Sequence, residues 1–273
     1  MKRIVLTILL LATFPFLILI WVWFQIPSEK EIKGCLTTKM FQVELCPTKP
    51  TYSKLRQISP YLQKAVVLTE DSLFWEHRGF DWNSIQKNYE ENKKVGRYKR
   101  GGSTITQQLA KNMFLTADKT LIRKGLEALI TMQIEKTLSK KEILERYLNV
   151  VEFGNKIYGV QKASRHYFKK SPSELSAVES AFLAMLLPSP KKYSASFYKK
   201  ELTPFASKRV RQIINHMYQF SRISESEYGQ ALIELESFFN PPSEVIVDSD
   251  ETEDLNQLTL EKLELESEQE DRF

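Results

Sequence analysis

Residues 101–112 read GGSTITQQLAKN, and they bring a glycine pair, hydroxyl groups and amides together at one helix start. Glycine is scarce elsewhere, with nine copies in 273 residues. Ile105, Leu109 and Met113 recur at helical spacing, so we predict a helix over residues 103–114. Backbone N–H groups at such a start can face an anion. A capped helix with a polar face explains the same pattern without a ligand.

The side chains of this stretch add chemistry to that helix start. Gln107 and Gln108 offer amide donors and acceptors that suit sugar hydroxyls. Lys111 lies about two helical turns after Thr104 and can supply a positive charge. So many polar groups on one helix indicate a binding site more specifically than a lone Gly-Gly-Ser would.

Helical patterns continue on both sides of this stretch. The predicted helix starts are Ser59-Pro60, Arg123, the capping box of Ser139 with Glu142, Ser171-Pro172 with Glu174, and Ser224 with Glu227. The helix from Ser171 is very apolar and is expected to end near Pro188. Alternating strand patterns are few and no internal repeat is present, so the predicted fold is mainly α.

A second informative stretch, residues 70–82, reads EDSLFWEHRGFDW and follows an apolar helix. An acidic pair at a helix end, close to aromatic side chains, can have a raised carboxyl pKa through desolvation. Such a carboxylate can serve as a general base near neutral pH. On spacing alone, the ordinary interpretation is the stronger: Glu70 is a solvated residue at a helix end, and Phe74 belongs to the core.

A third stretch, residues 119–127, reads KTLIRKGLE and places three cations and a carboxylate within about two helical turns. Arg123 and Glu127 are four residues apart, so an intrahelical salt bridge is the plain interpretation. The functional interpretation is a pyrophosphate clamp beside a second acidic group.

Together these stretches resemble the peptidoglycan glycosyltransferase family, in particular its free-standing monofunctional form. Residues 70–81 match the family motif E-D-x-x-F-x-x-H-x-G-x-D at every fixed position. Residues 101–112 match G-G-S-T-I-T-Q-Q-L-x-K-N throughout, and R-K-x-x-E is matched at residues 123–127. Residues 147–160 are similar to a fourth motif. The resemblance spans roughly residues 52–220 and is highly specific.

The resemblance implies that the protein polymerises lipid II, the lipid-linked disaccharide precursor, into glycan strands. Glu70 falls on the catalytic general base, and Glu127 falls on the second essential glutamate. The implied reaction forms β-1,4 bonds with inversion and releases undecaprenyl pyrophosphate. The implied fold is lysozyme-like, with a small membrane-associated lobe to which Met113-Phe114-Leu115 and the basic run 93–100 would belong.

The resemblance also assigns the substrate-binding residues. Asp71 would support Glu70, and the other residues would contact the sugars and the pyrophosphate: Ser103, Thr104, Gln107, Gln108, Lys111, Lys119 and Arg123. Many relatives carry Arg where Lys119 stands, and Lys offers a point charge instead of a fork of donors. No cofactor is required, although a divalent cation (Mg or Mn) could accompany the pyrophosphate.

The N-terminus predicts a membrane anchor. Residues 4–26 carry no charge and are long enough to span a bilayer core. Lys2 and Arg3 precede the run, so the catalytic domain would face the extracytoplasmic side of the inner membrane. A cleaved signal peptide is the alternative, but no small-residue cleavage site follows directly. In that compartment Cys35 and Cys46 could form a local disulfide or stay as two thiols.

We therefore expect four parts: an anchor at 1–26, a linker at 27–52, a glycosyltransferase domain at 53–240 and an acidic tail at 241–273. Residues 243–273 hold 12 acidic and 2 basic residues, a net charge of −10, which leaves +15 for the rest of the chain. A basic body suits anionic headgroups or a pyrophosphate substrate. The tail is expected to be disordered or a marginal helix.

Two other functions compete with polymerisation. A lysozyme or lytic transglycosylase also uses a glutamate, but it needs no pyrophosphate site. A catalytically inactive scaffold would not need the glutamates at both 70 and 127. The chain is too short for a transpeptidase domain, so a transpeptidase would be a separate partner. The three histidines lack metal-ligand spacing, and export makes nucleic acid an improbable partner.

Overall fold

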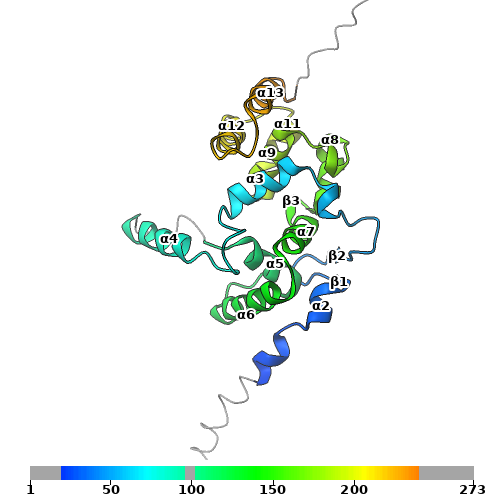
Figure 1. Cartoon of the computed structure of the whole chain (residues 1–273), viewed down its shortest axis with the longest axis vertical. Coiled ribbons are helices and arrows are strands. Elements are labelled where there is room, and N and C mark those ends of the chain that lie inside the picture. Colours follow the sequence, from blue (N-terminus) through cyan, green and yellow to red (C-terminus); the bar gives the residue numbers. More distant parts are fainter. Residues whose placement is uncertain (1–19, 96–101, 240–273) are drawn as a thin grey trace, which may run out of the picture. The chain divides into compact units, whose positions relative to one another are not determined.

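The structure, a computed structural model, describes residues 20–95 and 102–239, and within them the protein is mainly helical (Figure 1). This confirms the predicted helical class. Two short antiparallel hairpins pair β1 (Leu36–Thr37) with β2 (Glu44–Leu45) and β3 (Glu152–Gly154) with β4 (Ile157–Tyr158). The helices are α2 (Glu29–Lys33), η1 (Leu55–Gln57), α3 (Pro60–Glu70), α4 (Trp82–Val95), α5 (Ile105–Phe114), α6 (Leu121–Thr137), α7 (Lys140–Val150), α8 (Val160–Phe168), η2 (Pro172–Glu174), α9 (Ala177–Leu186), α10 (Pro190–Tyr193), α11 (Ala195–Lys199), α12 (Pro204–Gln219) and α13 (Glu225–Glu236).

Helix α9 lies at the centre of one group of helices. Nine of its ten residues are buried, among them Phe182 and Leu183, so it is apolar on every side. It packs against α3 and α12, and α13 contacts both α9 and α12. This packing fixes the position of α3, whose last residue is Glu70.

Helix α5 organises a second group by packing against α6 and α7. Its apolar stripe, with Ile105, Leu109 and Met113, is buried, as the spacing predicted. Phe114 is partly exposed and Leu115 is buried, so this segment contributes mostly to the core. Helices α3 and α5 belong to different groups. The end of α3 meets the start of α5 where the two groups join.

Residues 27–52 pack on the domain. A disulfide joins Cys35 to Cys46 across the β1–β2 hairpin, so the bridged alternative is the one that forms. Ile32 and Leu45 are fully buried, and α2 contacts α6. The domain boundaries stay a prediction, but the residues expected to form a linker contain an ordered helix and hairpin.

Two helix predictions need correction. The apolar helix does not open at Ser171-Pro172: Ser171 and Glu174 cap the short η2, and a second capping box begins α9 at Ala177. Helix α4 was not predicted, because polar residues dominate its sequence. In Figure 1 this helix lies apart from the others. The Asp81 carboxylate accepts a hydrogen bond from the Ser84 N–H at its start, a cap that could have revealed it.

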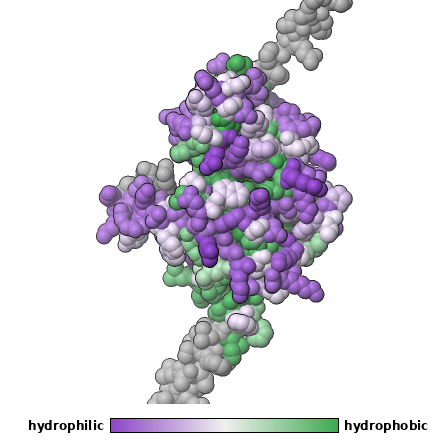
Figure 2. Space-filling model, in the orientation of Figure 1, coloured by the Kyte–Doolittle hydropathy of each residue, from purple (hydrophilic) through white to green (hydrophobic). Residues whose placement is uncertain are grey.

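In the described residues, no helix is both long and apolar enough to cross a bilayer. Most of the predicted anchor (1–19), part of the basic run (96–100) and the whole predicted tail (241–273) lie outside the described residues. The first described residues expose large apolar side chains: Ile20, Trp21, Trp23 and Phe24. Figure 2 shows hydrophobic residues, in green, gathered at the lower end of the described surface.

Candidate active site

Glu70 lies at the C-terminal end of α3, against α5. The Gln108 amide Nε2 donates a hydrogen bond to its Oε2 at 2.9 Å. Burial raises the pKa of the Glu70 carboxyl, because desolvation outweighs the stabilisation of the charged form by Gln108. The charges of Arg209 and Lys111 act in the same sense as Gln108 and only reduce the upward pKa shift. The residue is still partly exposed, so its carboxyl can reach a ligand.

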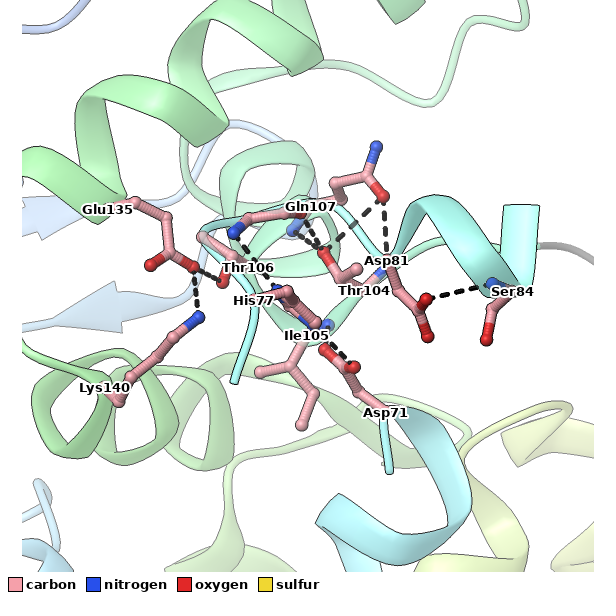
Figure 3. A network of polar contacts seen from close by, with 11 residues as sticks. Asp71, His77, Asp81, Ser84, Thr104, Ile105, Thr106, Gln107, Glu135 and Lys140 are labelled. Carbon is pink, nitrogen blue, oxygen red and sulfur yellow. Dashed lines mark hydrogen bonds and ion pairs between the residues drawn. The ribbon is translucent and has the colours of Figure 1, made fainter. Parts of the chain in front are cut away.

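The neighbouring Asp71 is buried and joins the first motif to α5 (Figure 3). Its Oδ2 accepts a hydrogen bond from the Ile105 N–H at 2.9 Å, and its Oδ1 lies 2.8 Å from His77 Nε2. The Gly79 N–H donates to His77 Nδ1, so in the neutral ring Nε2 carries the proton and donates it to Asp71. Burial raises the pKa of Asp71, against the effect of these two donors. Asp71 therefore supports the site structurally.

Gly79 allows this connection. Its φ of +92° is left-handed backbone, and a Cβ there would lie 2.8 Å from the Thr131 Cγ2. Its carbonyl accepts a hydrogen bond from Thr104 Oγ1 at 2.7 Å. The first motif is thereby tied to the N-terminus of α5 at two points.

Thr104 and Gln107 form a capping box at the start of α5. Gln107 N donates to Thr104 Oγ1, and Thr104 N donates to Gln107 Oε1 at 3.0 Å. Both residues are buried. The capped-helix alternative that the sequence left open therefore describes these two residues, whereas the neighbouring Ser103 is exposed.

A second polar cluster holds the same helix start from the side of α6 and α7 (Figure 3). Thr106 Oγ1 donates to Glu135 Oε1 at 2.5 Å, and Lys140 Nζ donates to the same oxygen at 2.7 Å. Lys140 also lies over the Phe74 ring at 4.6 Å. This cluster was not predicted from the sequence, because its members are scattered over three helices.

The second glutamate, Glu127, is buried in α6 and is held by two cations. Arg123 Nη1 lies 2.6 Å from its Oε2, which is the predicted salt bridge four residues apart. Lys124 Nζ binds its Oε1 and also donates to the Ser103 hydroxyl at 3.3 Å. Through this lysine, α6 contacts the start of α5.

Lys111 connects the two glutamates electrostatically. It is half-buried on α5, and burial lowers its pKa. The positive charges of Arg123 and Lys124 lower that pKa further, while Glu127 and Glu70 raise it. Lys119 lies just before α6 and is exposed.

A cavity of about 260 Å³ lies between α3, α4 and the start of α5. A larger cavity of about 540 Å³ lies beside α8, but neither glutamate lines it. We place the site at the smaller cavity because the first and second matched motifs meet there, whereas residues 119–127 do not line it. Its lining includes Glu70, Asp71, Asp81, Ser84, Asn88, Gly102, Ser103 and Thr104.

Two further residues lie near Glu70 and were not assigned from the sequence. Tyr147, on α7, donates its hydroxyl to Gln108 Oε1 at 3.0 Å, and Arg209 on α12 lowers the pKa of Glu70 through its charge. No spacing rule could find them, because the helices concerned meet only in the folded chain. In the described part of the chain, no group of three His, Cys, Asp or Glu side chains could hold a metal ion.

Comparison with known proteins gives a consistent result. The Transglycosylase family model matches residues 38–218, so the match includes strand β2 and Cys46 of the disulfide-linked hairpin. Over 189 residues the chain is 46% identical to a biosynthetic peptidoglycan transglycosylase of Nitrosospira multiformis, which covers 69% of this chain and 75% of that protein. Over 205 residues it is 44% identical to the protein of the same name from Acinetobacter baylyi, covering 71% and 88%. A third, from Azoarcus sp., is 43% identical over 198 residues, covering 69% and 86%.

Proposed function

The chain belongs to the transglycosylase family, and from this premise we propose that it extends glycan strands from lipid II with Glu70 as the general base. The enzyme is a peptidoglycan glycosyltransferase, and its substrates are lipid II and the nascent strand. The observation that carries the assignment of Glu70 is its position. It lines the cavity, burial raises its pKa, and its hydrogen-bond donor is a neutral amide.

In the proposed step, the 4-hydroxyl of the acceptor's terminal N-acetylglucosamine attacks the anomeric carbon of the growing chain. The new C–O bond forms as the bond to the pyrophosphate breaks, and undecaprenyl pyrophosphate leaves with the electron pair. The hydroxyl proton passes to the Glu70 carboxylate. Attack opposite the leaving group inverts the α-linked precursor to a β-1,4 bond. General-base assistance of this kind contributes about 10²–10⁴-fold in rate.

The cations on α5 and α6 would stabilise the leaving pyrophosphate. Lys111, Lys119 and Arg123 are the groups that we assign to it. In the structure Arg123 uses Nη1 for Glu127, while its buried Nε has no hydrogen-bond partner, so the guanidinium keeps donor capacity. Glu127 would hold the cations in place. Each charge-assisted contact is worth about 1.5–3 kcal/mol.

The sugar subsites would begin at the helix start of α5. Ser103 is exposed and lines the cavity, so we assign it a direct contact. Thr104 and Gln107 are engaged in the capping box, so we propose that they shape the subsite by fixing the backbone. Gln108 contacts Glu70, and Asp71 ties the first motif to α5. No metal or cofactor is required in this mechanism, and a divalent cation would arrive only with the pyrophosphate.

Peptidoglycan synthesis belongs to the cell envelope, and we propose a single-pass anchor in the inner membrane with the domain on its outer side. The uncharged run at residues 4–26 supports this, as do the exposed Trp21 and Trp23, since tryptophan favours the membrane interface. The disulfide between Cys35 and Cys46 fits an oxidising compartment.

We further propose a lysozyme-like domain whose small lobe contacts the bilayer. Leu121 and Ile122, at the start of α6, are 92% and 68% exposed and stand beside the proposed cations. Apolar side chains next to cations suit a surface that approaches a lipid-linked substrate. A separate transpeptidase would then cross-link the strands.

A polymerisation assay tests this function. The detergent-solubilised full chain is incubated with labelled lipid II, and the products are separated by gel, with Glu70→Gln as the control. A ladder of long glycan that is lost in the variant is the expected result. Bound lipid II without a ladder would favour a scaffold instead, and cleavage of preformed glycan would favour a lytic enzyme.

A further inference from the structure

Three side chains from three helices form a hydrogen-bonded chain that ends at Glu70. The Tyr147 hydroxyl on α7 donates to Gln108 Oε1 on α5 at 3.0 Å. Gln108 Nε2 then donates to Glu70 Oε2 on α3 at 2.9 Å. Tyr147 is fully buried, so it can act on the reaction only through Gln108.

The direction of these bonds is fixed by the chemistry of the groups. An amide oxygen only accepts, so Tyr147 must be the donor to Gln108. Burial raises the pKa of Tyr147, with smaller contributions from Glu70 and Asp71, so its hydroxyl keeps its proton. With Oε1 engaged, the amide Nε2 faces the Glu70 carboxylate. Without the hydroxyl, the amide could rotate and present its oxygen to that carboxylate, which is repulsive.

We propose that Tyr147 is a positioning residue for glycosyl transfer: its hydroxyl holds the Gln108 amide in the orientation that hydrogen-bonds Glu70. The inference rests on the proposed role of Glu70 as the base. It gives a buried tyrosine of the fourth motif a defined task, and it turns Gln108 from a sugar contact into a contact of the base.

The consequence is a shift in the pH dependence of the rate. Asp71 beside Glu70, Lys111 on α5 and Arg209 on α12 are the charged groups that face the base, and they are unchanged in Tyr147→Phe. That variant loosens a donor which favours the carboxylate, so the pKa of Glu70 rises further. Since the carboxylate is the active form, the acidic limb of the pH–rate profile moves to higher pH.

The test compares pH profiles of kcat for the wild type and three variants of the full chain. We expect Tyr147→Phe to move the acidic limb upward by about 0.5–1 pH unit, with KM nearly unchanged. Gln108→Leu removes the whole link and should move the limb by about 1–2 units. In the double variant the Tyr147→Phe change should add nothing, because its only route to Glu70 is gone.

Tyr167→Phe is the matched control. Tyr167 is also a buried tyrosine, and its hydroxyl donates to the Phe153 carbonyl at 2.9 Å, away from Glu70. Its loss should lower the melting temperature and leave the acidic limb in place. Thermal melts confirm that Tyr147→Phe, which keeps the ring in the core, is folded.

An unchanged acidic limb in folded Tyr147→Phe, or a loss that adds to that of Gln108→Leu, would overturn the positioning role. Failure of the proposed function gives a different result. If Glu70 is not the base, Glu70→Gln keeps its activity and its acidic limb. If only the positioning role fails, Glu70→Gln is inactive and Tyr147→Phe has the wild-type profile.

Discussion

The two glutamates of the site have contrasting surroundings. Glu70 ends a helix, receives a hydrogen bond from the neutral Gln108 amide, and burial raises its pKa. Glu127 lies within α6 and is held by Arg123 and Lys124. The same side chain is thus prepared for two tasks. In the proposed mechanism one carboxylate exchanges a proton, while the other anchors cations.

The largest effect is expected from Glu70→Gln. The amide keeps the shape of the side chain but cannot accept the substrate proton, so the polymerisation rate should fall by about 10²–10⁴-fold. Lipid II affinity should change little, because the cations are untouched. Parallel rate and binding measurements check this, and a variant with more than about a tenth of the wild-type rate would remove Glu70 from the base role.

The same substitution should change the pH dependence of stability. A carboxyl whose pKa is raised on folding destabilises the folded state as pH rises from its unfolded pKa through its folded pKa. This loss, present in the wild type above the ordinary glutamate pKa, should be absent in Glu70→Gln. Urea unfolding of both proteins at pH 4 and pH 8 measures it. An equal pH dependence in the two proteins would mean that Glu70 is not desolvated.

Glu127→Gln should have the next largest effect, of a different kind. It leaves Arg123 partly buried without its counter-ion, so the cations lose their positions and kcat/KM should fall by about 10²-fold. The free energy of unfolding should also fall, by about 2 kcal/mol. A melting temperature that falls in Glu127→Gln and not in Glu70→Gln would sharpen the contrast between the two glutamates. Equal melting temperatures in the two variants would remove that contrast.

Lys111→Ala probes the group that interacts with both glutamates, and its effect should be smaller. Loss of one charge-assisted contact to pyrophosphate should lower kcat/KM by about 10-fold, mainly through weaker substrate binding. Lys136→Ala, an exposed lysine in the last turn of α6, is the control and should behave as wild type. Unchanged affinity and rate in Lys111→Ala would contradict its place in the clamp.

The contrast between the glutamates could be predicted only in part from the sequence. The Arg123–Glu127 salt bridge follows from their spacing of four residues, because both lie on one helix face. The environment of Glu70 does not, because it is made by α3, α5, α7 and α12 together. Gln107 and Gln108 look equivalent in the sequence, yet one closes the capping box and the other donates a hydrogen bond to Glu70. Successive residues of a helix point in different directions, and only tertiary packing decides which one faces Glu70.

The fold, too, could be predicted from the sequence only where a local pattern determines it. Helices with an apolar stripe, such as α5, or with a capping box, such as α7, were found from the sequence with small errors at their ends. Helix α4 was not predicted because its sequence is mostly polar. Packing of the Cys35–Cys46 hairpin was also missed, since prolines and short strands leave little periodicity to detect.

The smallest effect on catalysis is expected from the disulfide that closes this hairpin. The N–H groups of Lys39 and Met40 donate to the Met113 and Asn112 carbonyls at 3.0 and 3.3 Å, so the hairpin satisfies the last turn of α5. A bridge between residues 11 apart stabilises the fold by about 2–3 kcal/mol. Cys35→Ser combined with Cys46→Ser should therefore lower the melting temperature by about 5–10 °C.

The effect of this double variant on activity should be small. Gln108 and Lys111 also lie on α5, but the groups that they interact with, Glu70 and the cations, belong to other helices and not to the hairpin. Below the new melting temperature, activity should thus stay within about twofold of wild type, because the activation free energy should change by less than the amount that gives a tenfold change in rate. Melting curves and rates at 20 °C measure both quantities. A folded double variant that loses as much activity as Lys111→Ala would mean that the hairpin, and not only α3, α6 and α7, holds α5 in its active position.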